Sequence, residues 1–190
     1  AAFFLTGRFY SNSQFKPLIR ELKEDGHYLG AHSDSHLLYC DWTKRDSMLV
    51  SDVQFKHDLQ ANYEKMEQFG IKSSDAPYFL PPYEWYNSTI VKWTKSEGHQ
   101  LINFSPGTRS AADYTYPEMG TGYRSSEEIY NSIITLEEKD QNGLNGFILI
   151  VHIGTDPRRK DKFYFKLKSL ITELKSRGYH FERVDELLKN

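Results

Sequence analysis

The chain has 190 residues, of which 38% are hydrophobic and 15% aromatic, which is enough apolar material for one folded domain. Lysine plus arginine number 24 and aspartate plus glutamate 26, so the net charge is −2. This balance excludes the basic surface expected of a nucleic-acid-binding protein. No apolar run approaches the ~18 residues of a membrane-inserting span, and the single cysteine, Cys40, excludes an internal disulfide framework.

The first half of the chain alternates short apolar segments with amphipathic ones. Ser51 and Gln54 form a capping box at the start of the longest predicted helix, which Gly70 ends. Trp42 and Trp93 stand in helix-like surroundings and are interpreted as packing residues. The expected strands cover residues 2–5, 27–31, 78–80 and 100–104, and the expected helices cover 14–24, 51–70 and 89–97.

The second half continues the alternation after an irregular loop, rich in Pro, Gly, Ser and Tyr, over residues 105–122. Ser125 and Glu128 form a second capping box, which begins another helix. The run Arg158–Lys160 is interpreted as a solvated basic patch. Further expected elements are a buried strand over residues 146–151, a helix over 163–175, a strand over 179–183 and a short closing helix.

Repeated strand–helix units predict an α/β fold with mainly parallel strands, in a single domain over residues 1–190. A barrel-like closure is favoured over an open sheet, because no Gly-rich phosphate loop follows the first strand. In such folds the chemistry lies at the carboxyl ends of the strands. Two of the expected strand ends carry histidine, at His32 and His152.

The first candidate site is the pair His32 and His36. A spacing of four would bring both imidazoles to one side of a helical turn, close enough to share a divalent ion. The alternative interpretation is a polar surface turn. His152, directly after the expected strand 146–151, is a candidate general acid or base, and its alternative is a core histidine bonded to a carbonyl.

The third candidate is the segment from Tyr78 to Tyr86. Pro81 and Pro82 fix the backbone at a strand end, so a backbone N–H can be aimed at a developing oxyanion. Tyr83 and Trp85 are candidate platforms for sugar rings, and the alternative is ordinary loop packing.

Together these segments resemble the polysaccharide deacetylases of the NodB-homology type, carbohydrate esterase family four. Residues 2–7, Ala-Phe-Phe-Leu-Thr-Gly, look like the family's first apolar strand. Residues 26–36 are similar to its metal-binding segment, His-Ser/Thr-x-x-His. Residues 80–83 align with its Arg-x-Pro-Tyr/Phe motif, and residues 150–152 with Leu-x-His. The likeness runs in order along nearly the whole chain.

The resemblance implies a distorted (β/α) barrel and the metal-dependent removal of acetyl groups from a carbohydrate. It implies that His32 and His36 hold a divalent metal, most simply Zn²⁺. The backbone N–H of Tyr83 would bind the oxyanion, and His152 would protonate the leaving group. From their place in the loop, Pro82, Tyr83 and Trp85 are the expected substrate contacts.

Departures from the family pattern lead to further expectations. The Thr-Phe-Asp-Asp motif, with the third metal ligand and the general base, is expected on a strand before Ala1. Without that strand, weak metal binding and inactivity are expected, together with an open sheet edge that favours homo-oligomers. Leu80 replaces the family's arginine. Asp113 is nearest to the Asp-x-x-Asp-Trp motif, and it either orients His152 or is a solvated loop aspartate.

The sequence therefore predicts a hydrolase that removes N- or O-linked acetyl groups from a poly- or oligosaccharide. The resemblance places it outside the cell or in the cell envelope, although no signal peptide is recognised. The alternative is a catalytically degenerate module that binds glycans or serves a structural role within a larger carbohydrate-active protein.

Overall fold

The computed structural model describes residues 1–189 and divides into two compact units. Unit 1 comprises Ala1–Asn103 with the C-terminal residues from Glu182, and unit 2 comprises Phe104–Phe181. The single domain expected over residues 1–190 stays a prediction.

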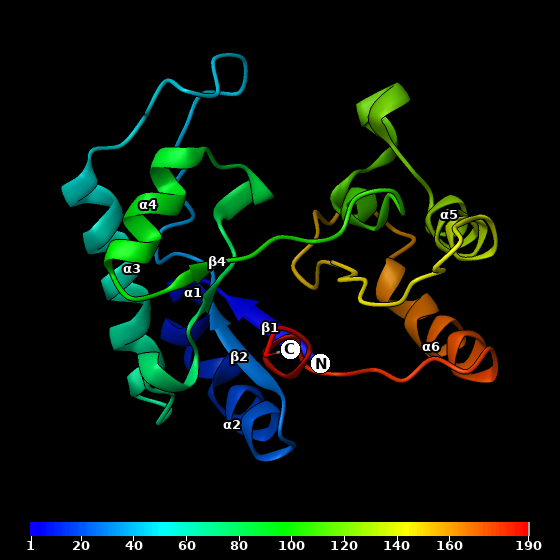
Figure 1. The fold of residues 1–190 in the computed structure, drawn as a ribbon, viewed down its shortest axis with the longest axis horizontal. Helices are drawn as coiled ribbons and strands as arrows, with labels where there is room; N and C mark the ends of the chain where they lie inside the picture. Colours follow the sequence, from blue (N-terminus) through cyan, green and yellow to red (C-terminus); the bar gives the residue numbers. More distant parts are fainter. Residues whose placement is uncertain (190) are drawn as a thin grey trace. The chain divides into compact units, whose positions relative to one another are not determined.

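Unit 1 is built on a four-stranded sheet in which every neighbouring pair is parallel and the strands follow in chain order (Figure 1). The first two strands pair over their full length, with Ala2 opposite Tyr28 and Leu5 opposite Ala31. The parallel sheet was expected, and it places the four carboxyl ends at one edge. The strands are β1 (Ala2–Leu5), β2 (Tyr28–Ala31), β3 (Tyr78–Phe79) and β4 (Gln100–Leu101).

The helices of unit 1 connect these strands, and α3 packs against both β2 and α4. Both bonds of the expected Ser51–Gln54 capping box are present at its start. Its buried face is apolar apart from Asp58 and Asn62, so the helix is held mainly by packing. The helices are α1 (Gly7–Ser11), α2 (Lys16–Glu24), α3 (Asp52–Glu67), α4 (Ser88–Ser96) and α7 (Val184–Leu187).

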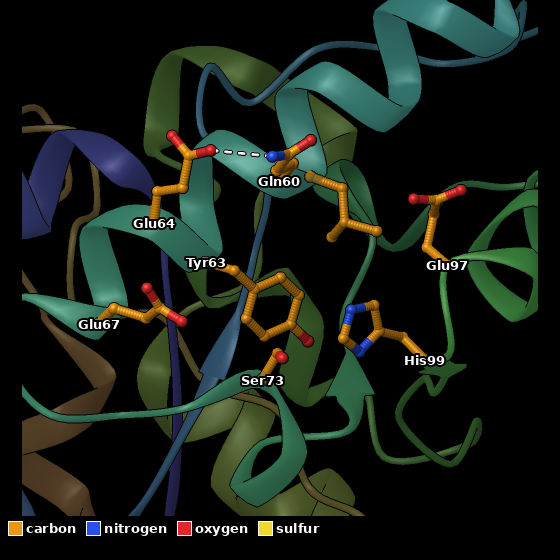
Figure 2. A pocket seen from close by; sticks show the side chains of 8 residues that line it. Gln60, Tyr63, Glu64, Glu67, Ser73, Glu97 and His99 are labelled. Carbon is orange, nitrogen blue, oxygen red and sulfur yellow. Dashed lines mark hydrogen bonds between the residues drawn. The ribbon is translucent and has the colours of Figure 1, made fainter.

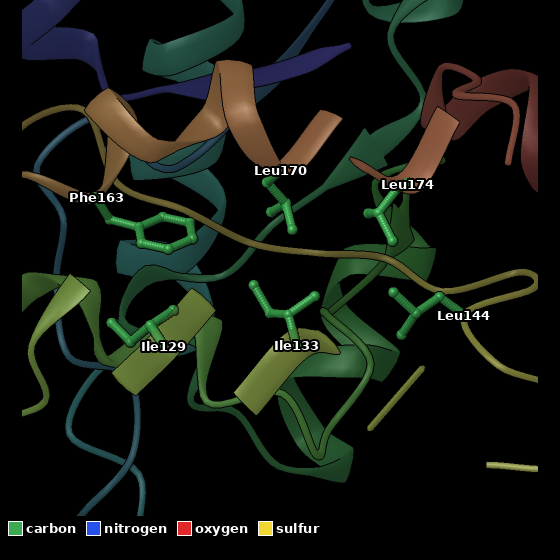
Figure 3. Close-up of a cluster of buried hydrophobic side chains, with 6 residues drawn as sticks. All are labelled: Ile129, Ile133, Leu144, Phe163, Leu170 and Leu174. Atoms are coloured by element: carbon green, nitrogen blue, oxygen red, sulfur yellow. The ribbon is translucent and has the colours of Figure 1, made fainter. Parts of the chain in front are cut away.

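Unit 2 has its own hydrophobic core between α5 (Ser126–Lys139) and α6 (Leu167–Ser176) (Figure 3). The expected Ser125–Glu128 capping box begins α5. No helix within residues 1–189 combines the length and apolar character needed to cross a bilayer. The buried core residues are Ile129, Ile133, Leu144, Phe163, Leu170 and Leu174.

The strands expected over residues 146–151 and 179–183 are wrong, because neither segment forms a β-ladder in unit 2. The backbone of Ile148 forms two hydrogen bonds with Ser105. Ser105 N donates to Ile148 O at 3.0 Å, and Ile148 N donates to the Ser105 hydroxyl at 3.1 Å. A side chain thus takes the place of a second backbone group, so no ladder continues from this contact.

Candidate functional site

His32 follows β2 directly, and its backbone and ring are both anchored. Its N–H donates to Asn62 Oδ1 at 2.9 Å, and its ring Nδ1 lies 2.8 Å from the carbonyl oxygen of Leu80, just after β3. A carbonyl oxygen can only accept, so Nδ1 carries the proton and the lone pair of the neutral ring is on Nε2. Metal-ligating histidines are commonly oriented by such a bond.

His36 is brought beside His32 by an irregular loop, and the helical turn expected from their spacing is wrong. Ser33 and His36 adopt left-handed backbone angles, φ 71° and 56°, at a cost of about 1–2 kcal/mol each. The Ser33 hydroxyl accepts from the His36 N–H at 2.9 Å, which closes the loop. The two imidazole centroids are 5.1 Å apart.

A buried carboxylate from α3 holds this loop, and sequence reasoning missed it. Asp58 accepts from the Ser33 hydroxyl at 2.5 Å, from Ser35 N at 2.9 Å and from the Tyr39 hydroxyl at 3.1 Å. Burial, together with the Asp58 charge, raises the pKa of Tyr39 well above its usual value, so the phenol remains a donor. The signal in the sequence was a polar pair four residues apart, Asp58 and Asn62, on the otherwise apolar face of α3.

Gly7 makes room for the same loop from the end of β1. A Cβ atom at Gly7 would overlap the Asp34 carboxylate. The Gly7 N–H donates to Ser33 O at 3.2 Å, and Asp34 pairs with Lys65 of α3 at 2.5 Å. Gly7, the first residue of α1, is therefore required by close approach rather than by its backbone angles.

The loop after β3 brings an aromatic ring to the histidine pair. Tyr83 has a left-handed backbone, φ 59°, and its ring centroid lies 4.5 Å from that of His36. Tyr83 is 45% exposed, whereas Pro82 beside it is buried.

The exposed partner of Tyr83 is Trp42, so the interpretation of Trp42 as a helix-packing residue is wrong. It lies in a loop, is 53% exposed, and has its ring centroid 5.5 Å from both Tyr83 and Trp85. Trp85 is half-buried, and the Arg45 guanidinium covers its ring at 4.2 Å. Trp93 packs on Phe55 as expected. Trp42, Tyr83 and Trp85 are called the aromatic cluster below.

In unit 2, His152 and Asp113 form a tightly bonded pair. One Asp113 oxygen accepts from His152 Nδ1 at 2.5 Å, and the other accepts from the His152 backbone N–H at 2.7 Å. Asp113 is 1% exposed, so the alternative of a solvated loop aspartate is wrong. Because the carboxylate accepts from Nδ1, the proton of a neutral ring is held on that nitrogen.

The loop that carries Asp113 is fastened by Arg159, and the interpretation of Arg159 as part of a solvated patch is wrong. Its side chain is 0% exposed. It donates to the carbonyl oxygens of Thr115 and Arg124 at 2.6 and 2.9 Å and to the Ser126 hydroxyl at 2.9 Å. Distant carbonyl groups thus replace the solvent that a buried guanidinium needs.

The donors at the histidine pair fit a borderline divalent ion only in part. Two imidazole nitrogens suit zinc or cobalt. Within residues 1–189, however, no three side chains of His, Cys, Asp or Glu are grouped so that they could hold an ion. Among the described residues, His32 and His36 are thus two candidate donors without a third grouped beside them.

Unit 1 also contains an acidic hollow of about 380 Å³, which shares no lining residue with the histidine loop (Figure 2). Tyr63 and His99 stack along one wall, with ring centroids 4.3 Å apart. Burial lowers the pKa of His99, which favours a neutral ring there. The hollow is lined by Leu59, Gln60, Tyr63, Glu64, Glu67, Ser73, Glu97 and His99.

A parallel sheet with a histidine pair after its second strand agrees with the family suggested by the motifs. The sequence matches the family described as polysaccharide deacetylase over residues 1–102, more than half of the chain. The chain therefore belongs to the polysaccharide deacetylase family.

Individual relatives agree with this assignment. A peptidoglycan-N-acetylglucosamine deacetylase of Bacillus cereus is 25% identical over 189 residues, which cover 100% of this chain and 75% of that protein. A family 4 acetyl xylan esterase from Clostridium thermocellum, solved with a cobalt ion, has a TM-score of 0.69 at 21% identity and covers 100% of this chain and 77% of that one. A family 4 pseudoenzyme from Bacillus anthracis has a TM-score of 0.69 at 19% identity. The match covers 99% of this chain and 55% of that one. The expected (β/α) barrel fold is confirmed by these structures.

Proposed function

We propose that the chain acts as a metal-dependent deacetylase, hydrolysing acetyl groups from a poly- or oligosaccharide. The observation that carries this proposal is the bond from His32 Nδ1 to Leu80 O, which leaves the lone pair on Nε2 while the His36 ring lies 5.1 Å away. Such an arrangement suits a pair of metal ligands. Membership of the polysaccharide deacetylase family supports it.

In this proposal His32 and His36 hold a divalent ion such as Zn²⁺, together with at least one further ligand. The bound ion would supply Lewis-acid polarisation of the acetyl carbonyl and a more acidic water. The backbone N–H of Tyr83 would donate to the oxyanion. His152, oriented by Asp113, would deliver a proton to the departing amine or alcohol.

We infer that the substrate is an acetylated glycan with exposed sugar faces, in the cell envelope or outside the cell. The aromatic cluster presents flat apolar rings beside His36, which suits the C–H faces of pyranoses. The Bacillus cereus relative is named for N-acetylglucosamine of peptidoglycan, which favours N-acetyl over O-acetyl substrates.

The test is acetate release by the full-length gene product with added Co²⁺ or Zn²⁺. Peptidoglycan-derived N-acetylglucosamine oligomers and O-acetylated xylan form the two arms. We expect release in the N-acetyl arm, abolished by the double change His32→Ala plus His36→Ala. No release in either arm would contradict the proposal.

Two observations favour a second function. The described residues offer two metal ligands, and a pseudoenzyme shares the fold. A degenerate module would bind the same oligosaccharides through the aromatic cluster without releasing acetate. Oligosaccharide binding that persists in the double histidine variant, with no acetate release by the native protein, would support that function instead.

A further inference from the structure

We propose that Asp58 and Asn62 of α3 are positioning residues that hold the histidine loop, residues 32–36, in the geometry needed to bind metal. This inference rests on the proposed function. It deepens that function by assigning the orientation of both histidines to one helix that contributes no ligand.

Asn62 links three segments at the edge of the sheet. Its Oδ1 accepts from the His32 N–H at 2.9 Å, and its Nδ2 donates to Leu5 O, at the end of β1, at 3.3 Å. The side chain is fully buried. Because the amide donates at one end and accepts at the other, reversing it would break both bonds. Asn62 therefore fixes the direction in which the backbone of His32 leaves β2.

Asp58 acts on the other end of the loop, one helical turn earlier. The Asp58 carboxylate accepts a hydrogen bond from the Ser33 hydroxyl. The oxygen of that hydroxyl, Ser33 Oγ, accepts in turn from the His36 N–H. The orientation of the serine hydroxyl is thus set by the carboxylate, and the backbone of His36 is set by the serine. Ser35 N donates to the second Asp58 oxygen, so both carboxylate oxygens engage the loop.

The chemistry of Asp58 points to a purpose beyond packing. A buried carboxylate is costly unless it is fully bonded, and an apolar residue would suit a helix face surrounded by Leu59 and Tyr63. Its hydrogen bonds instead end on residues 33–39 and stabilise two left-handed residues, Ser33 and His36. The carboxylate is therefore matched to the histidine loop.

The experiment compares Asp58→Ala and Asn62→Ala with a matched control, Tyr63→Phe. Tyr63 lies on the same helix and is buried, and its hydroxyl bonds Ala76 O at 2.8 Å, away from the loop. The protein is the full-length gene product, and folding is checked by circular dichroism and melting. If Asp58→Ala does not fold, Asp58→Asn, which keeps the shape, takes its place.

The first measurement is Co²⁺ binding, followed by its visible absorption. Loss of an outer-shell partner typically weakens metal binding about 10- to 100-fold. We expect that range for Asp58→Ala and Asn62→Ala, and at most a roughly two-fold change for Tyr63→Phe. Unchanged affinity in both test variants, or an equal loss in the control, would overturn the inference.

The second measurement needs no metal and separates this inference from the proposed function. Long-range ¹H–¹⁵N spectra of the metal-free protein report the tautomer of each histidine ring. We expect His32 with its proton fixed on Nδ1 in the native protein and in Tyr63→Phe, and an averaged tautomer in the two test variants. A native protein that shows this pattern but binds no Co²⁺ would refute the metal role and retain the positioning role. A fixed tautomer in all variants would refute the positioning role.

Discussion

The imidazole of His32 and the main chain of Leu80 are joined by a 2.8 Å hydrogen bond from Nδ1 to the carbonyl oxygen. This bond connects the loops that follow β2 and β3. Because the acceptor is a backbone group, the contact does not depend on the side chain at position 80, where the family has arginine.

Leu80→Ala should therefore reduce core packing while it leaves the orientation of the His32 ring unchanged. The buried leucine side chain contributes to the core, so its truncation should lower the free energy of unfolding by about 2–4 kcal/mol. The His32 tautomer should remain Nδ1–H in ¹⁵N spectra. Leu59→Ala, buried on α3, is the control for a similar loss of packing, and a changed tautomer in Leu80→Ala alone would contradict this view.

Gly7→Ala should disturb the histidine loop through Asp34. The new methyl group would overlap the Asp34 carboxylate and displace it from Lys65. We expect about 1–3 kcal/mol of lost stability, as for other overpacked sites, in chemical denaturation. Gly122→Ala is the control, because a Cβ there meets no atom within 4 Å. Equal stability of the two variants would contradict this prediction, because it would show that the loop moves away from the methyl group without a loss in the free energy of unfolding.

Trp42→Ala should weaken glycan binding and leave stability almost unchanged. The ring is mostly exposed, so the free energy of unfolding should change by less than about 0.5 kcal/mol. Loss of one aromatic contact of about 0.5–1.5 kcal/mol corresponds to a 2- to 10-fold lower affinity for N-acetylglucosamine oligomers in calorimetry. Phe165→Ala, an exposed aromatic residue of unit 2, should change neither quantity. Native affinity in Trp42→Ala would remove Trp42 from the proposed substrate contacts.

Asp113→Asn should impair proton transfer by His152. An amide that turns its NH₂ toward Nδ1 would favour the wrong tautomer of the ring. General acid catalysis is typically worth about 10²–10⁴ in rate, so acetate release should fall at least about 100-fold. The affinity for substrate should stay close to native. A loss in affinity with an unchanged turnover rate would instead assign Asp113 to binding.

The lowered pKa of His99 predicts that the free energy of unfolding depends on pH. Its pKa is lowered by burial in the folded state, so the unfolded chain takes up a proton first as the pH falls. Stability linked to His99 is therefore complete above about pH 6.5 and decreases as the pH drops below it. His99→Phe keeps the stack on Tyr63 and removes the titration. Between pH 7.5 and 5.5 the native melting temperature should fall further than that of the variant, and parallel curves would contradict this.

The sequence was informative where local rules decide the structure. The capping boxes at Ser51 and Ser125 were predicted from four-residue patterns and are both present. The paired strands β1 and β2, the second of which ends directly before His32, were predicted from short apolar or extended segments. The family was suggested by the resemblance of several motifs taken together, and the match over residues 1–102 confirms it.

Other features depend on partners far along the chain. Asp113 is buried because it meets His152, 39 residues later, and no local signal distinguishes it from a solvated loop aspartate. The apolar run around Ile148 has high strand propensity, yet a strand also requires a neighbour with a continuing ladder. Trp42 looks like a packing residue until the fold shows that it faces solvent.

The buried guanidinium of Arg159 gives unit 2 a further property. The Arg159 side chain donates to the carbonyl oxygens of Thr115 and Arg124 and to the Ser126 hydroxyl. These segments are therefore held together by hydrogen bonds to one side chain. They should open together, as a single cooperative unit of local unfolding, rather than fray one at a time. Local unfolding of the loop that carries Asp113 is thus coupled to Arg159, 46 positions later in the chain.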